Sequence, residues 1–99
     1  MFKKGNIVLV KGFVHTNYVG DDKKLFHWPC HKPWKGMVVG NSVLYTGRYQ
    51  ALYPDERGTL EQRKTQHVVM VIPLNTNQWV EPWRCLEEDL TKEGSDATT

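Results

Sequence analysis

The stretch at residues 25–36, LFHWPCHKPWKG, concentrates the side chains of this chain that can do chemistry. It holds two of the four tryptophans, two of the four histidines and one of the two cysteines, along with two prolines and two lysines. Imidazole and thiol groups can bind a metal or form a reactive pair, whereas tryptophans beside lysines suit a contact surface for a partner. Each kind of site demands its own residue spacing.

A metal site would use His27, Cys30 and His31, which lie within five residues of one another. Structural zinc needs four ligands in a tetrahedron, usually supplied as two well-spaced pairs. Here a single cluster is present, and the adjacent Cys30 and His31 side chains point apart in an extended chain. We therefore expect no metal and no other cofactor, with a small zinc-binding domain as an alternative.

Catalytic residues do not form a recognisable set. For Ser42 and Ser95, the sequence shows no general base that could activate the hydroxyl. Cys30 has histidine neighbours, but no third group that would orient a histidine can be identified. Glu87, Glu88 and Asp89 are consecutive, so they project in different directions on a helix. No phosphate-binding glycine motif is present. The sequence predicts a protein that is not an enzyme.

Composition describes a small, ordinary globular chain of 99 residues with a net charge of +2. We expect one domain over residues 1–93 and a flexible polar tail over residues 94–99. No apolar run approaches the ~20 residues that span a bilayer, and no signal-like segment follows Met1. Two cysteines without sign of export favour free thiols and a cytoplasmic location, with no membrane partner.

Hydrophobic patterning predicts a mainly β structure. Residues 5–14 and 67–74 are β-branched runs typical of strands, and residues 43–53 alternate with Gly47 marking a bulge. Residues 15–35 lack a period and predict a long loop, while residues 40–42 have turn chemistry. A short helix is expected after Pro82, ending near Gly94.

Four or five short strands with a long first loop and a short C-terminal helix describe a small antiparallel β-barrel. The chain resembles the Src-homology-3-like barrels, in particular the KOW and Tudor types. The segments that carry the resemblance are KKGNIVLVKG, WKGMVVGNSVLYTG, HVVMVIPL and WVEPWRCLEEDL. The resemblance implies contact with nucleic acid or with proteins of the transcription and translation machinery, as is common for KOW-type barrels.

A basic-aromatic surface is the functional hypothesis that the residues favour. The first 48 residues hold eight basic and two acidic side chains, so a basic patch can form there. Lysines would neutralise phosphates while tryptophans stack on unpaired bases. The alternative is a protein-binding adaptor or inhibitor, a role suited to a viral accessory protein, with the loop tryptophans as hot spots. The candidate residues for either partner are Lys11, Trp28, Lys32, Trp34, Lys35 and Arg48.

Overall fold

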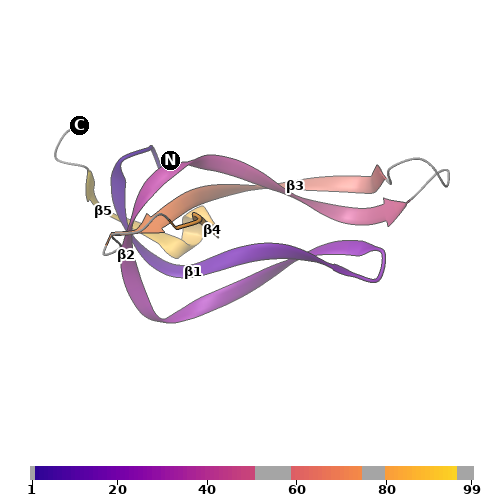
Figure 1. Cartoon of the computed structure of the whole chain (residues 1–99), viewed down its shortest axis with the longest axis horizontal. Helices are drawn as coiled ribbons and strands as arrows, with labels where there is room; N and C mark the ends of the chain where they lie inside the picture. Colours follow the sequence, from indigo (N-terminus) through magenta and orange to yellow (C-terminus); the bar gives the residue numbers. More distant parts are fainter. Residues whose placement is uncertain (1, 51–58, 75–79, 96–99) are drawn as a thin grey trace.

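The computed structural model describes residues 2–50, 59–74 and 80–95. In these ranges the chain forms five strands and one 3-10 turn (Figure 1): β1 (Asn6–Val19), β2 (Asp22–Gln50), β3 (Thr59–Pro73), β4 (Trp83–Cys85), η1 (Glu87–Asp89) and β5 (Leu90–Ser95). The strands pair antiparallel in one sheet with the order β4-β3-β2-β1-β5. The mainly β prediction is confirmed. Among these residues no helix is long and apolar enough to cross a membrane.

The long strand β2 bends and belongs to two hairpins. Its first part pairs with β1, and from Gly36 onward it pairs with β3. The outer parts of these hairpins are two-stranded ribbons, which we call the β1–β2 arm (residues 12–29) and the β2–β3 arm (residues 42–50 and 59–68). Figure 1 shows both arms extending to the same side of the molecule, which measures 52 × 27 × 27 Å.

A small core lies where all the strands meet. It consists mostly of buried valines, because strands present alternate side chains to the enclosed face. The sheet curls until β4 lies against β1, but no hydrogen-bonded ladder joins these two strands in the described part of the chain, so the expected barrel is not closed. The core residues are Val8, Val10, Val38, Val69, Val71, Cys85 and Leu90.

The prediction of a long loop over residues 15–35 is wrong. These residues form the β1–β2 hairpin, which reverses at Gly20 and Asp21 with Gly20 at a φ of 63°. Pro29 and Pro33 are tolerated because this part of β2 pairs with β1 alone, so a missing N–H costs no second ladder. Between Val10 and Gly12 the register shifts, and residues 30–33 of β2 form a bulge opposite the single residue Lys11 of β1.

The expected C-terminal helix is also wrong, because the segment from Pro82 onward forms β4, η1 and β5. Trp83 and Cys85 pair with Val71 and Val69 of β3. These residues therefore follow the two-residue repeat of a strand and not the spacing of a helix. Helix propensity is a weak preference that tertiary pairing overrides. The three acidic residues that suited a helix occupy η1 instead.

Two further predictions concern β2 and the tail. The turn expected at residues 40–42 does not form, because β2 continues through it with a register shift between Val38 and Gly40. The bulge predicted at Gly47 is confirmed by a register shift between Thr46 and Arg48 and by a φ of 139°. The expected tail begins inside β5, which includes residues 94–95, and its residues 96–99 lie outside the described part.

Candidate aromatic binding surface

Trp28 lies on the outside of the β1–β2 arm, beside two other rings. It pairs with Phe13 across the two strands, and 51% of its surface is exposed. Its indole Nε1 donates a hydrogen bond of 3.0 Å to Nδ1 of His15. The His15 ring is nearly parallel to that of Trp28, with centroids 6.0 Å apart, and to that of Phe26, at 5.4 Å. Cross-strand neighbours of this kind stiffen a ribbon and present ring faces to solvent.

A second group of rings lies where the arm meets the curled sheet. The ring of Phe13 is 4.7 Å from that of Trp83 at an angle of 66°, and Trp34 meets Trp83 edge to face at 6.4 Å. Trp83 is 42% exposed, whereas Trp34 is half-buried against the core. Phe13 links this group to the rings of the arm. We call the whole set the aromatic face: Phe13, His15, Phe26, Trp28, Trp34 and Trp83.

An open cavity of about 370 Å³ lies within the aromatic face. It is lined by three aromatic rings, one proline and one lysine: Phe13, Trp34, Trp83, Pro73 and Lys35. Largely apolar cavities of this size, with a few polar groups, are where proteins bind ligands. The flat rings suit a planar or apolar group, and the ammonium suits an anion attached to it.

The predicted basic residues are brought together only in part. Lys11, Lys32 and Lys35 are all exposed. Lys11 lies opposite the bulge that contains Lys32, and Lys35 lines the cavity. Arg48, in contrast, pairs with Glu61 on the β2–β3 arm, which separates it from the aromatic face. The structure thus brings Trp34 and Lys35 into one cavity, with Trp28 on the adjoining arm.

The three candidate metal ligands, His27, Cys30 and His31, each have a different environment. His27 Nε2 lies 2.7 Å from Oδ2 of Asp89, which ties the β1–β2 arm to η1. His31 is exposed, and Cys30 packs against the core. In the described ranges, no group of three or more histidine, cysteine or acidic residues is arranged to hold a metal ion. Burial, and then the charges of Cys30 and Asp89, raise the pKa of the Cys85 thiol from 9.0 to about 12.

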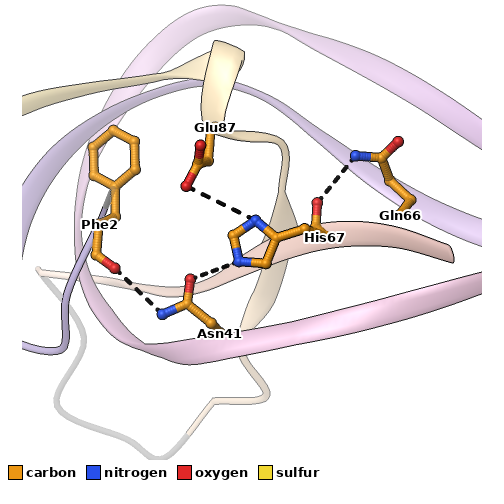
Figure 2. Close-up of polar contacts among 5 residues, drawn as sticks. All are labelled: Phe2, Asn41, Gln66, His67 and Glu87. Atoms are coloured by element: carbon orange, nitrogen blue, oxygen red, sulfur yellow. Dashed lines mark hydrogen bonds and ion pairs between the residues drawn. The ribbon is translucent and has the colours of Figure 1, made fainter.

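A second polar cluster lies at the base of the β2–β3 arm (Figure 2). Nε2 of His67 is 3.0 Å from Oδ1 of Asn41, whose Nδ2 donates to the Phe2 carbonyl oxygen at 3.3 Å. Nδ1 of His67 faces Oε1 of Glu87 at 3.8 Å. This cluster joins the N-terminal segment, β2, β3 and η1. These three contacts are at the surface of the molecule and link the segments to one another.

Sequence reasoning missed three members of the aromatic face, Phe13, His15 and Trp83, whereas Phe26 lies in the stretch at residues 25–36 that it singled out. Phe13 and His15 alternate along β1, and Phe26 and Trp28 alternate along β2, so the signal was a period of two on each side of the Gly20 turn. Trp83 was assigned to a helix, and only the pairing of β4 with β3 places it in the face.

No family model, no curated protein and no solved structure matches this chain. The candidate site therefore depends on the geometry and chemistry described above.

Proposed function

We propose that this chain is a non-enzymatic binding module that contacts single-stranded nucleic acid through the aromatic face. The observation that carries the proposal is the row of aromatic rings that reach solvent, with Trp28 51% and Trp83 42% exposed, next to exposed lysines. Soluble proteins rarely leave large apolar rings exposed in a connected set without a binding role. A cytoplasmic location, favoured by the two free cysteines, belongs to the same proposal.

Stacking supplies the first half of the proposed mechanism. An unpaired base offers an apolar face to an indole or phenyl ring, and each such contact contributes about 1–3 kcal/mol to binding. The cavity lined by Phe13, Trp34 and Trp83 would take one base, and the exposed ring of Trp28 would take another along the strand. Because every base has a flat face, this mode of binding tolerates many sequences.

Lysines supply the second half. Lys35 lines the cavity, and Lys32 lies in the bulge three residues before it. Each would neutralise a backbone phosphate and release a counterion, which makes binding depend on salt.

The mainly β architecture keeps open a relation to Src-homology-3-like barrels, which is the resemblance noted in the sequence. The five strands form one curled antiparallel sheet, in the order β4-β3-β2-β1-β5, which is compatible with that resemblance. KOW-type members of that group commonly contact nucleic acid or its machinery, which points to the same partner class. Fold alone does not define a function, so the aromatic face carries the argument.

A protein partner is the second candidate. The specific observation in its favour is the lining of the 370 Å³ cavity, where four of the five residues are aromatic or proline. Tryptophan-lined pockets bind apolar anchor residues of partner proteins and dominate the affinity of such interfaces. In this case the chain would act as an adaptor or inhibitor.

Binding of fluorescent single-stranded and duplex DNA and RNA across a salt series tests the proposal. We expect tighter binding to single strands, with affinity that falls as salt rises. The double substitution Lys32→Ala and Lys35→Ala should lower the slope of log affinity against log salt by roughly 1.4, since each phosphate contact contributes ~0.7 on single strands. Lys64→Ala, an exposed lysine of the β2–β3 arm, is the matched control and should leave the slope unchanged. Absence of binding to every oligonucleotide at low salt would reject nucleic acid and favour the protein partner.

A further inference from the structure

A second open cavity adjoins the cavity of the aromatic face. It has a volume of about 310 Å³ and is lined by residues 13–15 of β1 and by residues 81–84, which lead into and begin β4. We call it the β4 cavity. Phe13 and Trp83 line both cavities, and their rings lie 4.7 Å apart at an angle of 66°. This volume is at the small end of the range for ligand pockets and suits one flat group against a ring.

The β4 cavity contains two opposite charges that do not neutralise each other. Glu81 is exposed and Arg84 is half-buried, and both residues line the cavity. Within the described part of the chain, neither residue forms an ion pair. The guanidinium therefore keeps its N–H donors, and the carboxylate keeps both of its oxygens, for a ligand that enters the cavity. Such a ligand must present acceptors to one group and donors to the other.

The two charged groups recognise complementary hydrogen-bond patterns. A carboxylate accepts two parallel N–H bonds, and a guanidinium donates two parallel N–H bonds to neighbouring acceptors. Guanine has both patterns, because N1–H and the N2 amino group are adjacent donors on one edge, while O6 and N7 are adjacent acceptors on another. Adenine, cytosine, thymine and uracil have no two adjacent donor atoms. The lining of the β4 cavity therefore suits guanine better than the other unpaired bases.

We propose that the β4 cavity binds one unpaired guanine, with its ring against Trp83, its N1–H and N2 amino group toward Glu81, and its O6 and N7 toward Arg84. The ring of Trp83 is accessible for this contact, since the residue is 42% exposed. The inference rests on the proposed function, because a single strand on the aromatic face would bring its bases to this cavity. It adds a preference for guanine at one position of a strand that is otherwise bound by stacking.

The β4 cavity lies next to both places proposed for stacked bases. It shares Phe13 and Trp83 with the cavity that would take one base. It also includes His15, whose Nδ1 accepts the hydrogen bond from Nε1 of Trp28, and the ring of Trp28 would take another base. A strand that follows the aromatic face can therefore place a guanine in the β4 cavity with stacked neighbours. Free guanosine monophosphate would lack those neighbouring contacts.

Oligothymidine strands that carry one central purine test the preference with the native chain. Fluorescence polarisation should show that a strand with guanine binds about tenfold tighter than one with adenine, which is the order of discrimination that a well-formed pair of hydrogen bonds gives. Inosine, which lacks the N2 amino group, and 7-deazaguanine, which lacks N7, should each lose most of this advantage. Guanosine monophosphate should compete with the strand only at a far higher concentration.

Two substitutions test the role of each charged residue. Glu81→Gln should bring the affinity ratio of guanine to inosine strands close to one, and Arg84→Met should do the same for guanine and 7-deazaguanine strands. The matched controls are Glu93→Gln and Lys64→Met, at an exposed glutamate of β5 and an exposed lysine of the β2–β3 arm, and they should leave both ratios unchanged. A ratio of affinities is insensitive to a variant that is only partly folded, because the active fraction cancels.

The outcomes separate this inference from the proposed function. Equal affinity for all the oligothymidine strands overturns the guanine preference and leaves the proposed function in place. A guanine preference that survives both Glu81→Gln and Arg84→Met overturns the assignment to the β4 cavity. Guanosine monophosphate that competes as well as the strand overturns the strand as the ligand. Absence of binding by every oligonucleotide at low salt overturns the proposed function and this inference together.

Discussion

The two arms of this molecule have the same architecture but differ in what their side chains offer. Each is a two-stranded antiparallel ribbon that continues one half of β2. The β1–β2 arm carries the stacked rings of Phe26, His15 and Trp28, which join the cavity near Lys35 through Phe13. On the β2–β3 arm, exposed Val43 and Tyr45 lie opposite His67 and Thr65 in β3. A shared backbone plan thus leaves function to the residues at alternate positions.

The largest expected effect is at Gly36, where β2 passes from one hairpin to the other. A Cβ at buried Gly36 would lie 2.5 Å from Val71 Cγ1 and 2.7 Å from the carbonyl oxygen of Ile72. Gly36→Ala should therefore destabilise the fold by about 3 kcal/mol, because backbone atoms have to move. Chemical denaturation measures the loss. Gly40→Ala is the control, since its Cβ meets nothing within 4 Å; equal effects of the two variants would contradict the packing at Gly36.

The function proposed for the β1–β2 arm is tested by removing one exposed ring from each arm. Trp28→Ala should weaken binding of single-stranded oligonucleotides by about tenfold, because one stacking contact of about 1–3 kcal/mol is lost. Tyr45→Ala removes a ring of similar exposure, 42% against 51%, from the β2–β3 arm and should leave affinity unchanged. Fluorescence polarisation at fixed salt compares the two. A larger loss for Tyr45→Ala would move the binding surface to the other arm.

Each arm contacts η1 through one histidine–carboxylate pair, and the two pairs should differ in interaction energy. His27 and Asp89 are 2.7 Å apart with the Asp89 side chain only 15% exposed, whereas His67 and Glu87 are 3.8 Å apart and both 45% exposed. Double-mutant cycles with His→Gln, Asp→Asn and Glu→Gln changes should give a coupling of about 1 kcal/mol for the first pair and close to zero for the second. Denaturation at pH 6 would measure both. Equal couplings would mean that burial and distance do not distinguish the two attachments.

The buried Cys85 thiol of the core gives the smallest expected effect at neutral pH. The pKa of the buried Cys85 thiol is about 12 in the folded chain, against an ordinary value of 9.0. The unfolded chain therefore loses this proton first as pH rises, so its contribution to stability is complete below pH 9 and falls between pH 9 and 12. Denaturation across this range should show a steeper loss for the native chain than for Cys85→Ala. Identical slopes would contradict the raised pKa.

Much of the strand content could be predicted from local sequence. The runs at residues 5–14 and 67–74 are strands, and Gly47 marks a bulge, because β-branched residues and a central glycine leave few other options. Residues 15–35 were predicted wrongly as a loop. Prolines and tryptophans hide the alternation there, and a bulge at residues 30–33 shifts its phase by several residues. Only the pairing with β1 reveals it.

The sequence predicted the type of candidate site, a basic-aromatic surface, but not the full set of residues that form it. Trp34 and Lys35 do line one cavity, and Trp28 is exposed, as a basic-aromatic surface requires. Trp83 joins them from a segment about fifty residues away, whereas Arg48 lies on the β2–β3 arm, apart from the aromatic face. Sequence spacing says nothing about which strands meet when a sheet curls, since that depends on long-range packing.

By itself, the sequence determined that this is a small β protein with free thiols and a concentration of tryptophan, histidine and lysine after its first strand, because composition and β-branched runs are local properties. The tertiary structure decided that β2 serves two hairpins, that β4 approaches β1, and that rings from three strands share one face. Those outcomes come from burying one common core of valines, and no single segment of the chain contains the information about its partners in that core.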